Sequence, residues 1–292
     1  MDWISRQFST RVIVLMPVAI ALNIVLGATV QQALKLPIYL DSIGTILVGV
    51  LAGPLAGILT GVLTNLIWGY LLPAPIGTTT IGPFAITAGA IGLLAGIFGW
   101  LGFYRSRPGA PGRATLGAVV ALILVGALTF YTYSRAYADP TRYSETTFFD
   151  PTTFEQSRIF FLVTMVIFIA LIGWGLFQRR DVGAVYAVSA GLAIGIVAAI
   201  VSAPISAIVF GGVTGSGTDA LVAAFRAAGA SLEQATLQQG LLADPLDKMV
   251  TSFVVFFIVH SLSRRVMARF PNGERLLPGA EPSRGDLRDA GA

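Results

Sequence analysis

The chain contains no cysteine and a single histidine, His260. The absence of cysteine excludes disulfide bonds, thiolate metal sites and cysteine nucleophiles, and one histidine cannot build a multi-histidine metal centre. The sequence also lacks HExxH, GxSxG and GxxxxGK[ST], the motifs of zinc hydrolases, serine hydrolases and P-loop nucleotide-binding proteins. We therefore expect no enzymatic activity, no bound metal and no cofactor.

Charged residues are scarce as well. They make up 12% of the chain, whereas a soluble domain has about 25%. Hydrophobic residues account for 55%, and the mean hydropathy is +0.78. The first apolar run is longer than the core of a signal peptide and has no small-residue cleavage site. This composition excludes an ordinary water-soluble domain and predicts a polytopic membrane protein.

Seven apolar runs approach the length of about 20 residues that crosses a bilayer as a helix. They are residues 12–34, 54–72, 83–104, 114–137, 158–178, 182–210 and 246–263. A further apolar stretch, 41–52, is too short to cross and predicts a short helix packed within the bundle, with Asp41 and Ser42 capping its start. The expected fold class is all-α, a transmembrane helix bundle.

The positions of Lys and Arg predict which helix ends face the cytoplasm. With the N-terminus placed inside, 13 of the 19 basic residues fall in inner segments. The positive-inside rule then predicts that both termini are cytoplasmic. A basic cytoplasmic rim is ordinary for a membrane protein, so the net charge of +4 does not call for a nucleic-acid partner.

Two predicted helices carry small residues at every fourth position. The first row is Gly53, Gly57, Gly61, Asn65 and Gly69, and the second is Gly183, Ala187, Gly191, Gly195, Ala199 and Ala203. Small residues at this spacing let helix backbones approach closely in a bilayer. Asn65 has two interpretations: a hydrogen-bonded packing residue, or one that looks into a substrate cavity together with Trp68.

The predicted outer connections are longer and more polar than the inner ones, which indicates that the outer face performs recognition. The longest, 211–245, begins with a glycine-rich turn, and Thr218 and Asp219 are placed to cap a helix there. A second amphipathic piece, 231–242, opens at Ser231. This segment is either a lid over a cavity or a plain connecting loop.

Asp247 and Lys248 stand one residue into the last apolar run, near its predicted outer end. Ionisable groups in such a position are costly and usually face a partner or a cavity. Two interpretations are open. In the first, Asp247 caps the helix and the long side chain of Lys248 reaches to the membrane interface; in the second, both side chains contact the ligand. The same two interpretations apply to Asp41.

Three segments carry a resemblance to a known family. They are 36–44, which leads into the short helix; the Gly-Pro-Leu-Ala-Gly-x3-Gly-x3-Asn stretch at 53–65; and the outer segment that ends in Asp244-Pro-Leu-Asp-Lys248. This pattern resembles the substrate-binding S component of energy-coupling factor (ECF) transporters, the vitamin importers of prokaryotes. The resemblance covers 10–105 and 182–270.

The resemblance implies a six-helix core that binds one small solute from outside and docks on a transmembrane coupling subunit driven by two ATPases. We therefore expect a single transmembrane domain over 1–270, with an inserted helical hairpin at 114–178 that the family lacks, and a disordered cytoplasmic tail over 271–292. The small-residue surface that the family uses for docking corresponds to the row Ala19, Asn23 and Gly27.

The expected function is substrate capture in a prokaryotic cytoplasmic membrane, with a vitamin-like or heterocyclic solute as ligand. Aromatic rings and hydroxyls suit a flat heterocycle. The candidate binding residues are Asp41, Asn65, Trp68, Tyr70, Thr78, Thr79, Thr80, Phe84, Asp219, Asp247 and Lys248.

Two alternatives stay open. A secondary transporter would have an ionisable residue deep in the membrane, whereas the ionisable residues here are predicted near helix ends. A stand-alone binding or sensor protein is the other alternative, although the expected tail of about two dozen residues is too short for an output domain.

Overall fold

The computed structural model describes residues 2–108, 111–141, 151–179 and 181–279. Within these residues the chain forms helices and no strands. The helices that build the bundle are α2 (Thr10–Gly27), α3 (Ile43–Ala52), α4 (Pro54–Leu66), α5 (Ala85–Trp100), α6 (Pro111–Ala136), α8 (Pro151–Arg179), α9 (Val182–Phe210) and α11 (Leu232–Ser261). The shorter elements are α1 (Asp2–Gln7), η1 (Ala28–Ala33), η2 (Ile67–Leu71), η3 (Thr79–Phe84), α10 (Asp219–Ala227), α12 (Arg264–Met267) and α13 (Gly273–Leu276).

Six helical segments of the described chain are long and apolar enough to cross a membrane. They are Thr10–Ala33, Pro54–Leu71, Thr79–Trp100, Thr115–Ala136, Phe154–Gly175 and Val182–Phe210. The all-helical fold class is confirmed, and these segments are compatible with a multi-pass membrane protein. The seventh predicted run lies in α11, which carries charged residues in its middle and is not among the six.

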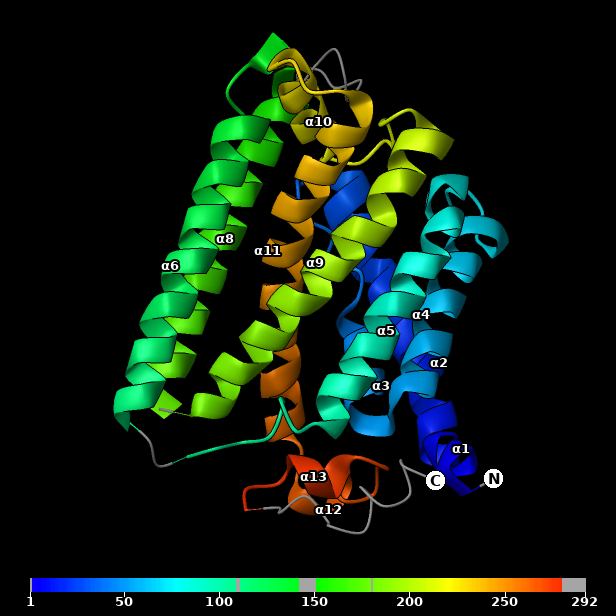
Figure 1. Ribbon diagram of the computed structural model, residues 1–292. Coiled ribbons are helices and arrows are strands. Elements are labelled where there is room, and N and C mark those ends of the chain that lie inside the picture. The colour runs from blue at the N-terminus through cyan, green and yellow to red at the C-terminus, as the bar shows by residue number, and fades with distance from the viewer. Residues whose placement is uncertain (1, 109–110, 142–150, 180, 280–292) are drawn as a thin grey trace.

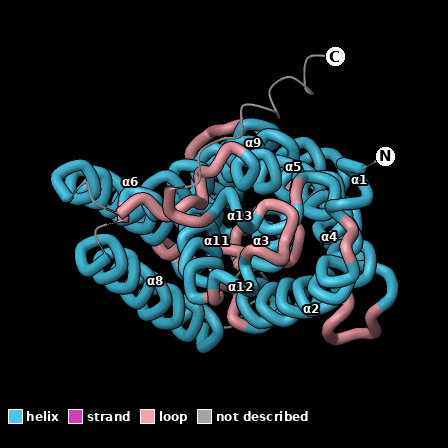
Figure 2. The backbone as a smooth tube through the Cα atoms, turned by 90° about the horizontal axis from the view of Figure 1, so that it is seen from below, coloured by secondary structure: helices cyan, strands magenta, loops and turns pink. Residues whose placement is uncertain are grey.

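The short helix α3 lies inside the bundle and is buried over its whole length. Seen from below in Figure 2, it is enclosed by α2, α4, α5 and α11, and all four contact it. This explains why its sequence is apolar on every side, since a helix without a polar face has to be covered all round. Helices α6 and α8 lie side by side at one edge, away from α2 to α5 (Figure 1).

The glycine row of α4 packs against α5, as its spacing predicts. A Cβ atom added to Gly57 would lie 2.4 Å from the carbonyl oxygen of Gly92, and one added to Gly61 would lie 2.3 Å from that of Ala88. The two backbones are therefore in direct contact. The small residues of α9 serve α11 in the same way, because Gly191 and Gly195 lie against the backbone of Lys248 and Pro245.

Helix α11 contains two segments that were predicted from the sequence as separate elements. The amphipathic piece 231–242 and the last apolar run form one continuous helix, which begins with a capping box between Ser231 and Gln234. Pro245 is accommodated inside it. Asp247 and Lys248 consequently lie in the middle of a long helix, buried to 1% and 2% exposure. The prediction that they stand near a helix end is wrong.

The chain after α11 folds back onto the bundle. The backbone N–H of Asn272 donates to Leu51 O at 2.9 Å and its side chain donates to Val50 O at 3.2 Å, so Asn272 satisfies carbonyl groups at the end of α3. Leu276 is fully buried. The disordered tail predicted from residue 271 is therefore wrong for 271–279, and its remainder, 280–292, lies outside the described residues.

The tight contact between α4 and α5 can be tested by adding one methyl group. Gly57→Ala should lower the melting temperature of the detergent-purified protein, because overpacking costs about 1–3 kcal/mol. The matched control is Gly126→Ala in α6, where an added Cβ has no atom within 4 Å among the described residues. Equal melting temperatures for the two variants would contradict the packing described here.

Candidate functional site

A cavity of about 670 Å³ opens among the segments that join the helices at the end of the bundle opposite α12 and α13. Its size lies within the range of small-molecule sites. Most of its lining side chains are polar. The polar ones are Gln31, Gln32, Lys35, Tyr39, Asp41, Ser42, Thr45, Asn65, Thr78, Thr80, Thr87, Ser202, Ser206, Thr214, Ser216, Thr218, Gln239, Asp244 and Lys248, and the apolar residues of the lining include Phe84.

Six of the eleven candidate residues line this cavity: Asp41, Asn65, Thr78, Thr80, Phe84 and Lys248. The Asn65 amide donates to Ile81 O at 3.4 Å, and the hydroxyls of Thr78 and Thr80 bond each other at 2.9 Å. Both interpretations of Asn65 therefore describe part of its surroundings. A direct contact of these side chains with a solute stays a prediction.

The other five candidates do not line the cavity. Trp68 is fully buried and its indole N–H donates to Ile76 O at 2.8 Å, so it fixes the segment after η2. Tyr70 is 57% exposed and Thr79 is also exposed. Asp219 and Asp247 are buried behind the cavity wall, where each holds the backbone of a lining segment.

Asp219 shapes the glycine-rich turn. Its carboxylate accepts the backbone N–H groups of Thr214 and Gly215, the latter at 2.7 Å, and the Thr214 hydroxyl at 2.8 Å. Gly211, Gly212 and Gly215 adopt positive φ, which glycine permits at little cost. The predicted capping of α10 is wrong for the side chain of Thr218, which makes no cap bond. Burial raises the pKa of Asp219, although its hydrogen bonds and nearby Lys35 act in the opposite direction.

The 34–42 segment is fixed to α11 by buried ionic and polar contacts. Asp247 Oδ1 accepts the backbone N–H of Leu40 at 2.7 Å, while Oδ2 pairs with the ammonium of Lys248. Lys248 also lies 3.5 Å from Asp41 Oδ1, and Asp41 Oδ2 accepts the Gln31 amide at 2.9 Å. Asp41 therefore binds neighbouring side chains, and Ser42 at the start of α3 makes no cap bond, so the predicted capping is wrong.

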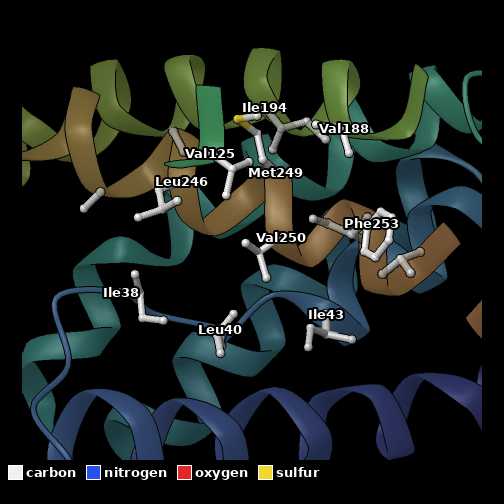
Figure 3. Packing of buried hydrophobic residues seen from close by; sticks show 14 of the residues in the cluster. Ile38, Leu40, Ile43, Val125, Val188, Ile194, Leu246, Met249, Val250 and Phe253 are labelled. Carbon is white, nitrogen blue, oxygen red and sulfur yellow. The ribbon is translucent and has the colours of Figure 1, made fainter. Parts of the chain in front are cut away.

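Apolar contacts accompany these polar ones. Ile38 and Leu40 of the segment and Ile43 of α3 lie opposite Leu246 and Val250 of α11 (Figure 3). Leu40 adopts a φ of +53°, which is strained for a residue with a side chain. The carboxylate of Asp247 and this apolar packing together hold the strained conformation.

Tyr39 connects three parts of the cavity lining by hydrogen bonds: its own segment, α11 and the residues just before α10. Its hydroxyl accepts from Gln239 of α11 at 2.9 Å and donates to Thr218 at 3.3 Å. Burial raises the pKa of Tyr39 well above its ordinary value, so it stays a neutral donor. Lys35 adds a second tie, since its ammonium donates to Gly215 O at 2.5 Å. Burial lowers the pKa of Lys35, with Asp219 opposing that effect.

Two buried hydroxyls of the lining have no hydrogen-bond partner in the described part of the chain. They belong to Ser42 and Thr87, which are 4% and 7% exposed. The side-chain amide nitrogen of Gln32 is likewise buried and has no hydrogen-bond partner among the described residues. An unsatisfied buried polar group costs about 1–3 kcal/mol. An ordered water or a polar atom of a bound solute would satisfy such a group.

The row predicted to dock a coupling subunit faces the interior of this chain. Asn23 donates to the hydroxyls of Thr45 and Thr64, and it accepts the backbone N–H of Gly44 at 2.7 Å. Ala19 packs against Gly44, and Gly27 packs against Trp68 and Asp41. The row thus joins α2 to α3 and α4, and it is not open to a partner.

Several lining residues were not predicted from the sequence as binding residues. They are Gln31, Gln32, Lys35, Tyr39, Ser42, Thr45, Thr87, Ser202, Ser206, Thr214, Ser216, Thr218, Gln239 and Asp244. The adjacent glutamines at the end of an apolar run were a usable signal, since such a pair is unusual there. The serines of α9 gave no such signal, because hydroxyls in apolar helices commonly form hydrogen bonds with the backbone of their own helix.

No family model, curated protein or solved structure matches the chain. The functional argument therefore rests on the geometry of the cavity.

The role of Asp247 can be separated from that of a ligand contact. Asp247→Ala should destabilise the protein by about 3–5 kcal/mol, because it leaves the buried ammonium of Lys248 short of a partner. Thermal unfolding in detergent measures the loss. Asp247→Asn keeps an oxygen that can accept the Leu40 N–H and should therefore lose less stability than Asp247→Ala. A melting temperature unchanged by Asp247→Ala would contradict the structural role.

Proposed function

We propose that this protein is the substrate-capture subunit of an ECF-type importer in a prokaryotic cytoplasmic membrane. It binds a small vitamin-like or heterocyclic solute from the outer side, and both of its termini are cytoplasmic. A transmembrane coupling subunit and ATPase subunits supply the energy for uptake. The chain itself carries out no chemistry.

The observation that carries this proposal is the cavity and its position. It lies at the end of the bundle opposite α12 and α13, whereas most basic residues belong to segments at the α12 and α13 end or to the tail. The positive-inside rule assigns the basic end to the cytoplasm, which turns the cavity outward. Phe84 and Tyr39 offer aromatic rings to a ligand, and the hydroxyls around them offer hydrogen bonds.

The proposed coupling subunit needs a surface other than the row Ala19, Asn23 and Gly27, which is covered. On the same helix, Ile13, Val14, Val18 and Val25 are more than half exposed. Lipid or the coupling subunit would meet α2 on that face.

A secondary transporter is the second candidate, and one observation favours it. Asp244, Asp247 and Lys248 lie buried in the middle of α11, where ionisable groups serve ion or proton coupling in many transporters. The argument from helix ends, which disfavoured this candidate, no longer applies.

A thermal-shift screen of the detergent-purified chain tests the binding function. The panel contains vitamins, their precursors and nucleobases. A true ligand at 100 times its dissociation constant should stabilise the folded state by about 2.7 kcal/mol. The variant Asn65→Ala should reduce the shift if the amide faces the ligand, with Ser134→Ala on α6, outside the cavity lining, as the control. The absence of any shift across the panel would contradict the binding function.

Uptake into proteoliposomes separates the two candidates. The purified chain alone should not accumulate the solute that the screen identifies, with or without a proton or sodium gradient. Accumulation should require the coupling subunit and ATPases with ATP inside. Gradient-driven uptake by the chain alone would establish the secondary transporter instead.

A further inference from the structure

The ionisable side chains around the cavity fall into two groups. In the first group, Lys35 donates to Gly215 O and interacts with Asp219, so one positive charge faces one negative charge. In the second group, Asp41 and Asp244 line the cavity beside Lys248, and Asp247 pairs with Lys248 from behind the cavity wall. Among the described residues, this second group combines three carboxylates with a single ammonium. When all four are ionised, the second group carries an excess of negative charge.

The three carboxylates are not equally satisfied. Asp247 holds both the Leu40 N–H and Lys248, and Asp41 holds the Gln31 amide and shares Lys248 at 3.5 Å. Asp244 is 5% exposed and receives one hydrogen bond within the described chain, from Ser202 at 3.3 Å. A carboxylate has room for about four such bonds. Asp244 therefore is the lining carboxylate with the most unused capacity.

Lys248 does not offer a counter-charge for an anionic solute. Its side chain is 2% exposed, and its ammonium is already engaged by Asp247 and Asp41. A carboxylate or phosphate on a ligand would have to compete with these partners and would meet Asp244 beside them. A cationic ligand would be favoured instead, because it would neutralise the negative charge of the buried carboxylates, which is costly to leave uncompensated.

We infer that the cavity selects a small organic cation, whose protonated or quaternary nitrogen is held by the carboxylates of Asp244 and Asp41. The aromatic ring of Phe84 in the lining favours such a group further through cation–π attraction. The unpartnered hydroxyls of Ser42 and Thr87 independently mark the same cavity as built for a polar ligand. This inference rests on the proposed binding function and specifies its substrate class.

Sets of nearly isosteric probes that differ in charge test the inference. One set is tryptamine, tryptophol and indole-3-acetate; another is 3-aminomethylpyridine, 3-hydroxymethylpyridine and nicotinate. Thermal shifts and titration calorimetry on the full chain in detergent should give the tightest binding for the amine of each set. Among the solutes that bind in the vitamin and nucleobase screen, the cationic ones should likewise bind more tightly than the neutral and anionic ones.

Variants identify the carboxylate responsible. Asp244→Asn keeps the shape of the side chain and should weaken amine binding roughly 10- to 100-fold, the equivalent of one charge-assisted hydrogen bond, while neutral probes are affected less. Glu233→Gln is the matched control, because Glu233 is an exposed carboxylate on the same helix. It should leave amine binding unchanged.

The possible failures are distinguishable. Binding in which the neutral or anionic members match or exceed the amines would overturn the cation inference and leave the binding function standing. The same holds if the screen yields ligands and none is cationic, or if Asp244→Asn binds the amines as tightly as the wild type. If no compound of either panel shifts the melting temperature or binds in calorimetry, both the binding function and the inference are overturned.

Discussion

The structure depends on a buried ionic contact between a connecting segment and the middle of a long helix. Asp247 of α11 binds the backbone of Leu40 and the ammonium of Lys248, which in turn reaches Asp41. Charges removed from water are tolerated only when they are paired and hydrogen-bonded. The need to satisfy them forces the 34–42 segment deep into the bundle, and that segment then supplies a wall of the cavity.

The small residues make this arrangement possible. Helix α11 approaches α9 closely where Gly191 and Gly195 meet Lys248 and Pro245. A larger side chain at either glycine would move the ionic contact away from its partners. Helix packing and cavity formation are thus parts of one constraint, because the same turns of α11 touch α9 on one side and the 34–42 segment on the other.

The sequence predicts the helices and their close contacts well. Apolar length and small-residue spacing depend on local pattern, and the α4 to α5 contact at Gly57 follows from it. The continuity of α11 could not be predicted, since Pro245 and the polar residues before it favour a break until tertiary contacts override them. The roles of Trp68, Asp219 and Asn23 could not be predicted for a similar reason. A polar or aromatic residue near a helix end suits a cavity or a packing contact equally, and only the partner helix decides between them.

The cavity residues show the same limit. Asp41 and Lys248 were found because charges are rare in apolar sequence, whereas nothing in the sequence marks Ser42 and Thr87 as part of a cavity. What makes them notable is the absence of a hydrogen-bond partner in the described chain, a property of the folded arrangement.

Hydrogen–deuterium exchange of the 34–42 segment tests the central claim most directly. The account predicts that its amides, that of Leu40 above all, exchange as slowly in the wild-type protein as those of neighbouring helices, and much faster in Asp247→Ala, which removes the acceptor of the Leu40 N–H. An equally slow exchange in the variant, or rapid exchange of this segment in the wild type, would contradict the view that the contact with Asp247 holds the segment and shapes the cavity.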